Sequence, residues 1–512
     1  MVTRAGALVA SAVAGLALAP AAAAAELQLQ PTLELSENWS DNPTLVSDSQ
    51  AHSQFITEVS PGFTLAEDSN RLQLRASYKL NLFAYSDRRL SGSDAANNEL
   101  ALAAKARLVG ELLYVDVNAG VSQQPVSPFA PVNSDADYLA NNRSEVRSYS
   151  VSPYLTQRFG SAAVGTLRYT HDVVSSSQGG LGNSDGDSLA LSLSNGPALR
   201  RWGWDVAASR QNLNDHIAPT SDSNNANFGV HFGLSDDFSL LENLGYDKFS
   251  YESGPGAPTQ GKSWSTGFKW EPSTRTSLQM TAGRRYYGPS YGLNGMHRSR
   301  HTVWSLSYND AVTTSRDQFL LPSSVDTAAL LNSMLTAQIP DPVQRAAAVA
   351  AFIRSNGLPA SLANSINYFS NRYILQKEAL ATAALNGAHA TLLFSLFRTR
   401  RTALSSIQED SELLGSQNAE LYDNTNQVGA SIVANYSLNS RTSSALSASY
   451  GKTDSLSLQQ TQVNRSWRWM VSHQFQPRLS GVFELRQTRN VQSPGDLAYT
   501  EHAVAVSISM KF

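Results

Sequence analysis

The chain has 512 residues, no cysteine and a formal net charge of −3. A charge so close to zero argues against nucleic acid as a partner, and the lack of cysteine excludes disulfides, thiolate metal ligands and a cysteine nucleophile. Only 16% of the residues are charged, which is below the roughly 25% typical of soluble domains. The composition therefore describes a polar but weakly charged protein that is held together by its core or its sheet.

The first 25 residues have the parts of a secretory signal peptide. Arg4 supplies the positive start, residues 5–19 form an apolar run, and Ala23 to Ala25 supply a small-residue cleavage site. We expect residues 1–25 to be removed on export. Because no later stretch has the apolar length of a membrane helix, the exported chain is predicted to be either a soluble protein or an outer-membrane barrel.

Residues 71–87 alternate strictly between two kinds of side chain. One row is apolar and runs from Leu72 to Ala84, and the other is polar and runs from Arg71 to Asn81. A period of two marks a β-strand, and this one is much longer than the usual five or six residues. A strand tilted across a bilayer needs such length and turns its apolar row outward. The alternative is a long strand of a soluble sandwich with one wet face.

The same alternation recurs along the chain and gives about 21 candidate strands. Bacterial single-chain barrels have even strand numbers. We therefore predict an all-β fold over residues 26–512, a transmembrane antiparallel β-barrel of about 20 strands, with 18 to 22 allowed. Short turns, such as residues 160–161 and 439–440, alternate along the chain with long polar connections, such as residues 122–145, 175–187 and 211–226. This alternation is typical of outer-membrane barrels.

Aromatic residues near the predicted strand ends are expected to form girdles at the membrane interfaces. They are Tyr85, Trp202, Tyr286, Tyr287 and Trp304.

The polar rows of the strands are predicted to face a lumen and to line a transport path. The charged residues assigned to this path are Arg71, Arg75, Lys79, Lys105, Arg107, Asp116, Arg168, Lys269, Arg285, Arg468, Glu484 and Arg486. With Tyr114 and Tyr154 interleaved, such a wall offers hydrogen bonds and ring surfaces to a hydrated sugar chain. The alternative is that any wide lumen is polar and that its buried charges pair for stability.

One segment, residues 321–369, breaks the alternation with a helical pattern. Asp341 and Pro342 suit an N-cap followed by the first helical position, and Gly357 suits a helix end. We predict a helical insertion that gates or plugs the lumen, with Leu331, Leu335, Arg345 and Phe352 as candidate gate residues. The alternative is a helical lid outside the lumen.

The last strand ends on an aromatic residue. Val504, Val506, Ile508, Met510 and Phe512 share one face. This pattern resembles the C-terminal signal by which outer-membrane proteins are recognised for assembly, so Phe512 is predicted to act as an assembly signal.

No catalytic pattern stands out in the sequence. There is no G-x-S-x-G elbow and no phosphate-binding loop. His297 and His301 lie four residues apart, which on a strand is about 13 Å, too far to share one metal ion. We predict no catalytic residue, no metal site and no cofactor, and the chain is not expected to be an enzyme.

Two regions resemble a known family. Leu33-x-Leu35-Ser-Glu37-x-Trp39-Ser-Asp41-Asn42 and the stretch Phe55 to Gly62 resemble the opening strands of the PEP-CTERM/exosortase-system-associated outer-membrane β-barrel family, of the β-barrel porin type. The insertion, with Arg316-Asp-Gln-Phe319 and Asp341-Pro342-x-x-Arg345, resembles the same family.

The resemblance implies a channel in the outer membrane of a Gram-negative bacterium that takes part in exporting exopolysaccharide to the cell surface. Outer-membrane lipid, a polysaccharide chain and periplasmic polysaccharide-export proteins are then the expected partners. Two alternatives stay open: a general diffusion porin, and a non-conducting docking or structural barrel of a secretion assembly.

Overall fold

The computed structural model describes residues 27–87, 96–130, 142–177, 183–197, 199, 201–215, 220–251, 258–320, 331, 349, 370, 372–406, 420–494 and 497–512. The predicted signal peptide, residues 1–25, lies outside the described residues. Within these ranges no helix has the length and apolar character that a membrane crossing requires.

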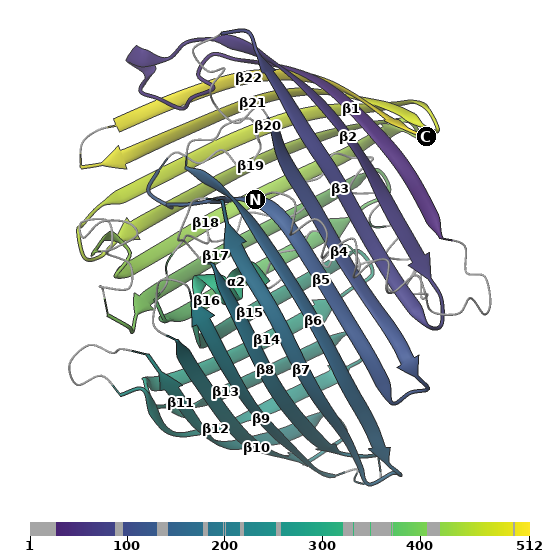
Figure 1. Cartoon of the computed structure of the whole chain (residues 1–512), viewed down its shortest axis with the longest axis vertical. Coiled ribbons are helices and arrows are strands. Elements are labelled where there is room, and N and C mark those ends of the chain that lie inside the picture. Colours follow the sequence, from purple (N-terminus) through teal and green to yellow (C-terminus); the bar gives the residue numbers. More distant parts are fainter. Residues whose placement is uncertain are drawn as a thin grey trace.

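The described chain consists almost entirely of strands (Figure 1). They are β1 (Gln28–Ser40), β2 (Gln54–Asp68), β3 (Leu72–Tyr85), β4 (Ala96–Val109), β5 (Leu113–Pro125), β6 (Arg143–Phe159), β7 (Ala163–Ser176), β8 (Ser184–Asn195), β9 (Trp202–Asp215), β10 (Ser221–Gly233), β11 (Phe238–Ser250), β12 (Gln260–Ser273), β13 (Thr276–Arg285), β14 (Gly288–Arg298), β15 (Thr302–Thr313), β16 (Ile374–Asn386), β17 (Ala390–Ala403), β18 (Asn424–Asn439), β19 (Thr442–Ser455), β20 (Thr461–Gln476), β21 (Leu479–Ser493) and β22 (Leu497–Lys511). Two short helices accompany them, η1 (Asp48–Gln50) and α2 (Ser315–Leu320).

Each strand pairs with its neighbours in the sequence, and β1 pairs with β22 to close the ring. The described strands therefore form a closed 22-stranded antiparallel barrel, and the all-β fold class is confirmed. The strand number is higher than the expected 20 and equals the upper end of the allowed range. Closure pairs the backbone groups along both edges of the sheet, as a membrane interior requires.

The strands have one polar and one apolar face, as β3 illustrates. Asn81 is completely buried and hydrogen-bonds to Ser60, Asn97 and Glu99 on the neighbouring strands. The next residue, Leu82, is 39% exposed. Buried polar residues beside exposed apolar ones reverse the arrangement of a soluble protein. The apolar row is therefore the outer, lipid-facing surface, and the polar row faces the lumen.

One end of the barrel has only short turns, and all the long connections lie at the other end, together with a few short ones such as residues 286–287 between β13 and β14. Both ends of the described chain, near Gln28 and Lys511, lie at the short-turn end. Outer-membrane barrels have short periplasmic turns and longer extracellular loops, so the long-connection end is the extracellular end. The apolar outer surface and this asymmetry identify an outer-membrane barrel.

The long connections are shorter than expected. Strand β8 begins at Ser184, inside the connection predicted over residues 175–187, and β9 and β10 extend into the connection predicted over residues 211–226. These strand ends carry Asp, Asn and Ser on both faces. Strands that rise above the bilayer have no apolar row, so alternation cannot reveal them.

The predicted aromatic girdles are only partly correct. Trp202 and Trp304 are exposed near the short-turn ends of β9 and β15, where an interfacial girdle belongs. Tyr85 instead packs against a buried cluster that contains Phe83. Tyr286 packs against Phe249. Their positions near strand ends could not tell the inner face from the outer one.

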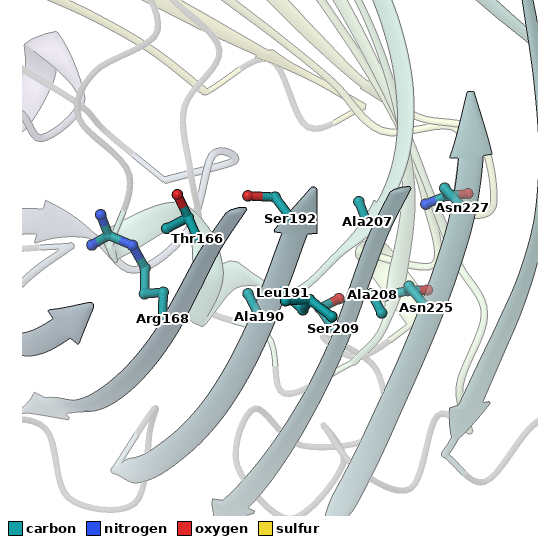
Figure 2. A pocket seen from close by; sticks show the side chains of 10 residues that line it. All are labelled: Thr166, Arg168, Ala190, Leu191, Ser192, Ala207, Ala208, Ser209, Asn225 and Asn227. Carbon is teal, nitrogen blue, oxygen red and sulfur yellow. The ribbon is translucent and has the colours of Figure 1, made fainter. Parts of the chain in front are cut away.

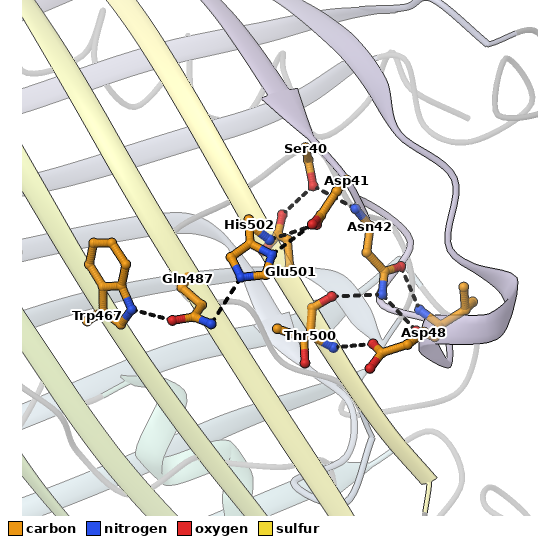
Figure 3. Close-up of polar contacts among 10 residues, drawn as sticks. Ser40, Asp41, Asn42, Asp48, Trp467, Gln487, Thr500, Glu501 and His502 are labelled. Carbon is orange, nitrogen blue, oxygen red and sulfur yellow. Dashed lines mark hydrogen bonds and ion pairs between the residues drawn. The ribbon is translucent and has the colours of Figure 1, made fainter.

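Side-chain hydrogen bonds link the closing strand pair, β1 and β22, on both faces of the sheet (Figure 3). On the inner face the Ser40 hydroxyl donates to Glu501, with an O–O distance of 2.8 Å. On the outer face His502 Nδ1 lies 2.8 Å from the Asp41 carboxylate and its Nε2 lies 3.1 Å from Gln487. Side chains thus reinforce the one strand pair that joins the two ends of the chain.

Candidate functional site

The inner wall over β20 to β22 holds a buried network of opposite charges. Arg468 lies 2.5 Å from Glu484, Arg486 lies 3.1 Å from the same carboxylate, and Arg486 also lies 3.4 Å from Glu501. A buried charge without a partner is strongly destabilising. Arg468, Glu484 and Arg486 were all predicted to face the lumen, and the structure places them there as a connected group.

Other predicted lumen residues also find partners on neighbouring strands. Lys79 lies 3.5 Å from Glu34 and 3.4 Å from Glu58. Arg285 Nε donates to the buried Asp247 carboxylate at 3.1 Å. The inner wall therefore balances much of its own charge, which agrees with the alternative that buried lumen charges pair for stability.

An aromatic group lies on the inner wall of β4 to β7. The rings of Tyr114 and Tyr154 stack with their centroids 5.1 Å apart. The Arg168 guanidinium lies 4.0 Å from the Tyr154 centroid and also pairs with Asp116 at 2.8 Å. Lys105 Nζ lies 5.7 Å from the Tyr114 centroid. These predicted lumen residues thus form one aromatic and cationic cluster.

Beside this cluster the wall carries a shallow pocket of about 220 Å³ (Figure 2). Its inner-face lining includes Thr166, Ser192, Ser209, Asn225 and Asn227. Hydroxyl and amide groups of this kind both donate and accept hydrogen bonds. Arg168 also lines the pocket, so the pocket offers hydrogen bonds from hydroxyl, amide and guanidinium groups to hydroxylated groups or water.

The remaining predicted lumen residues make fewer contacts. Lys269 pairs with Glu271 at 2.7 Å, and Arg75 shares the inner row of β3. Arg107 lies opposite Tyr114, and Arg71 lies in the turn before β3. A role of any of these residues in transport stays a prediction.

The short helix α2 connects to the opposite inner wall. It directly follows β15, yet its Arg316 forms a salt bridge with Asp172 on β7 and donates to Ser184 on β8 at 2.5 Å. Arg316 and Asp172 are both about 5% exposed. Phe319 and Leu320 of the same helix pack against Val146 and Val174. We call the contact of Arg316 with Asp172 and Ser184 the latch.

The same helix also holds the wall from which it starts. Gln318 donates to Gln376 on β16 at 2.5 Å, and Arg401 on β17 donates to Gln318 at 2.8 Å. Strands β7 and β16 are nine positions apart in the ring of 22 strands. Helix α2 therefore bridges two distant parts of the barrel wall at the extracellular end, and it lies within the barrel outline in Figure 1.

The chain is anchored again where it returns to β16. The Tyr373 hydroxyl lies 2.7 Å from the Ser221 hydroxyl of β10, and its ring stacks on Tyr251 at 4.7 Å. Nearby, Tyr286 packs on Phe249, and burial raises the pKa of Tyr286, so its hydroxyl stays protonated at neutral pH. The residues that flank the insertion are thus held by strands other than β15 and β16, namely β7 and β8 before it and β10 after it.

A second bridge crosses the mouth from the β5–β6 connection. Phe129 packs in a buried cluster with Leu421 and Tyr422 of the β17–β18 connection. Gln462 on β20 donates to the Ala130 carbonyl at 2.9 Å. Two connections from different sides of the ring therefore narrow the extracellular mouth.

The predicted helical insertion, residues 321–369, is described only at Leu331 and Val349. Both are helical and buried, with 4% and 1% exposure. The other candidate gate residues, Leu335, Arg345 and Phe352, lie outside the described residues, and the gate role stays a prediction for all four candidates. The sequence interpretation missed Arg316 as a contact residue, because its partner Asp172 is 144 positions away.

The chemistry of enzymes was not expected here. In the part of the chain that the structure describes, no three His, Asp or Glu side chains gather as a metal site.

Phe512 is exposed, and its backbone N–H donates to the Pro31 carbonyl on the first strand at 3.0 Å. Its role as an assembly signal stays a prediction.

Fold and site together define a large outer-membrane barrel with a polar lumen and a bridged extracellular mouth. No family model and no curated protein matches the sequence. Among solved structures, the siderophore receptor PirA from Pseudomonas aeruginosa is similar at 12% identity and a TM-score of 0.43, covering 95% of this chain and 80% of the receptor.

Two further similar structures are a second receptor and a protein solved with vanillate. The ferric enterobactin receptor PfeA, from Pseudomonas aeruginosa, has 11% identity, a TM-score of 0.48 and coverage of 96% and 82%. OpdK with vanillate, from the same organism, has 10% identity, a TM-score of 0.35 and coverage of 95% and 99%. Values this low transfer no ligand to the present chain.

Proposed function

We propose that this protein is a gated outer-membrane channel that takes part in the export of exopolysaccharide. The observation that carries the gating part is the bridge that α2 makes from β15 to β7 and β8. A helix held by its own ion pair across a polar lumen limits passage while that pair is intact. Passage of a solute or polymer then depends on whether the latch contact of Arg316 with Asp172 and Ser184 is formed or broken.

The contacts suit a movable element better than a permanent plug. Among the described residues, α2 makes one buried ion pair and a few hydrogen bonds, and its Phe319 and Leu320 pack in a small cluster around Val146 and Val174. A buried ion pair replaced by other polar partners costs far less than one left unpaired. A partner protein or polymer that supplies such groups to Arg316 and Asp172 would release the helix.

The substrate class rests on the wall chemistry and on the family resemblance. Stacked Tyr114 and Tyr154 present ring faces, and the nearby pocket presents hydroxyl and amide groups. Sugar rings use both kinds of contact, and the mixed wall charge neither attracts nor excludes a neutral polymer. The same wall also suits small hydrophilic solutes, which keeps a diffusion porin as the second candidate.

Planar-bilayer recording of the purified full chain tests the gate. The wild-type barrel is expected to conduct weakly, and Arg316→Ala is expected to raise single-channel conductance because it releases α2 from β7 and β8. Arg147→Ala is the matched control, since Arg147 forms a similar salt bridge with Glu145 but on the outer face. Large, steady conductance in the wild type would favour a porin, and silence of both the wild type and Arg316→Ala would favour a docking barrel.

Deletion of the gene tests whether the protein takes part in exopolysaccharide export. Loss of cell-surface polysaccharide, restored by the wild-type gene, is the expected result. Unchanged surface polysaccharide would remove exopolysaccharide export from the proposal and leave the gate to be judged by conductance alone.

A further inference from the structure

Strands β16 and β17 carry an unusual pair of charges on their outer face. Gln376 and Arg401 hydrogen-bond to each other on the inner face at 2.9 Å. Their sequence neighbours, Lys377 and Arg400, therefore point outward, and they lie directly opposite each other in the strand register. Like charges facing each other across a strand pair are destabilising.

The same arrangement recurs on β20 and β21. Arg468 and Arg486 face the lumen, so the alternation of the strands turns Arg465 and Arg489 outward. These two arginines are also directly opposite each other, and both are exposed. Two like-charge pairs on one outer wall need an external source of negative charge.

The protein itself supplies only part of that charge. Asp310 on β15 lies directly opposite Lys377, but its carboxylate already accepts hydrogen bonds from Tyr287, Ser290 and the Tyr291 backbone N–H. Arg398 donates only to the neutral amide of Asn426, and Arg465 lies 5.9 Å from the Tyr450 ring. Among the described residues, Lys452 pairs with Asp454, whereas Arg400, Arg465 and Arg489 form no ion pair. We call these six residues the outer cation band: Lys377, Arg398, Arg400, Lys452, Arg465 and Arg489.

On the opposite outer wall, two outward basic side chains have carboxylate partners from the chain. Arg147 on β6 lies 2.6 Å from Glu145, and His171 on β7 lies 2.9 Å from Asp187 on β8. Carboxylates from the chain therefore accompany the outward cations there. The outer face carries further cations elsewhere, such as Arg210 on β9 and Lys248 on β11, but these lie opposite neutral residues. What distinguishes β16 to β21 is therefore the directly opposed like-charge pairs.

The position of the outer cation band along the membrane normal indicates which part of the lipid it contacts. Arg465 lies two residues from Trp467 toward the extracellular end, on the same face, which is roughly 7 Å along the strand. Exposed tryptophans such as Trp467 mark the interface between hydrocarbon and headgroups. Below the band the wall turns apolar, with Leu396, Ile432 and Trp469 exposed. The band is therefore at headgroup level, directly above a surface for acyl chains.

We propose that the outer cation band binds the phosphate groups of lipopolysaccharide in the outer leaflet. This lipid joins several acyl chains to a headgroup with more than one phosphate, which matches an apolar wall topped by repeated cations. Arginine forks bind phosphate oxygens in pairs and form strong charge-assisted hydrogen bonds. Bound phosphate between Arg465 and Arg489, and between Lys377 and Arg400, turns each repulsion into a shared contact. This proposal does not depend on what the barrel transports.

Binding of lipopolysaccharide to the purified full chain in detergent, measured by native mass spectrometry, tests the assignment. The double variant Arg465→Gln, Arg489→Gln is expected to weaken binding at least about tenfold, because two charge-assisted contacts are lost. Lys377→Gln with Arg400→Gln is a second, independent variant pair. The matched control is Arg147→Gln on the opposite wall, which should bind like the wild type.

Two further lipids identify the chemical source of the contact. Chemically dephosphorylated lipopolysaccharide should bind the wild type about as weakly as intact lipid binds the double variant, and phosphatidylglycerol should bind less tightly than lipopolysaccharide. Equal binding of the dephosphorylated lipid or of phosphatidylglycerol would overturn the proposal. So would wild-type affinity in both variant pairs, once each shows the heat-dependent gel mobility of a folded barrel.

Discussion

Two faces of the same two strands, β20 and β21, use arginine in opposite ways. On the inner face Arg468 and Arg486 share Glu484, at 2.5 and 3.1 Å. On the outer face Arg465 and Arg489 lie opposite each other with no carboxylate between them. The strands, the residue type and the register are shared, so only the environment of each face differs.

The difference shows where each face obtains its negative charge. The lumen side of β20 to β22 buries Arg486 and partly buries Arg468, and a buried cation needs a partner from the protein itself. The outer side is exposed and can take its counter-charge from the membrane. The inner pairs therefore contribute to folding, and the outer pairs are free to bind lipid. The following predictions separate these two roles.

The largest effect is expected on the inner face. Glu484→Ala leaves Arg468 and Arg486 without their shared carboxylate and should lower the free energy of unfolding by about 3–5 kcal/mol. Urea unfolding of the purified barrel in detergent measures the loss. Arg465→Ala, from the outer face of the neighbouring strand β20, is the control and should change stability far less. Equal losses in the two variants would show that the faces do not differ.

A smaller effect, of opposite sign, is expected on the outer face. Arg489→Glu replaces a like-charge pair with an ion pair to Arg465 and should stabilise the lipopolysaccharide-free barrel by about 0.2–1 kcal/mol. Unfolding in detergent measures this gain, and Arg489→Gln separates the loss of repulsion from the new attraction. If Arg489→Glu is less stable than the wild type, the two arginines do not repel each other in the way proposed.

The smallest effect is expected on the opposite wall. Arg147 already has Glu145 as a partner, and both are on the outer surface. Exposed ion pairs contribute little, so Arg147→Gln should shift the free energy of unfolding by no more than about 0.5 kcal/mol. The urea midpoint is the measurement. A loss as large as that of Glu484→Ala would mean that the outer wall depends on its own ion pairs after all.

Much of the barrel could be predicted from local pattern alone. Strict alternation in residues 71–87 predicted a membrane strand, and β3 covers Leu72–Tyr85. The same rule placed Lys79, Arg168 and Arg486 on the polar face, where the structure has them. This succeeds because the side-chain period of a strand is a property of the backbone and needs no knowledge of its partners.

Pattern failed where both faces of a strand are polar. The start of β8, Ser184 to Ser188, was interpreted as part of a long connection. Above the bilayer no lipid demands an apolar row, so the alternation disappears while the backbone pairing continues. The bounds of these strands were therefore placed too close to the membrane, whereas the estimate of about 20 strands came from a count of 21 and the even-number rule.

By itself, the sequence determined the fold class, the two faces of the strands and the predominantly polar character of the lumen. Only the tertiary structure decided which residues meet across the barrel: Arg316 with Asp172, 144 positions away, and Arg465 opposite Arg489. Pairing of this kind depends on strand register and on how the ring closes. Register is fixed jointly by turn lengths, bulges and the number of strands, so no single stretch of sequence contains it.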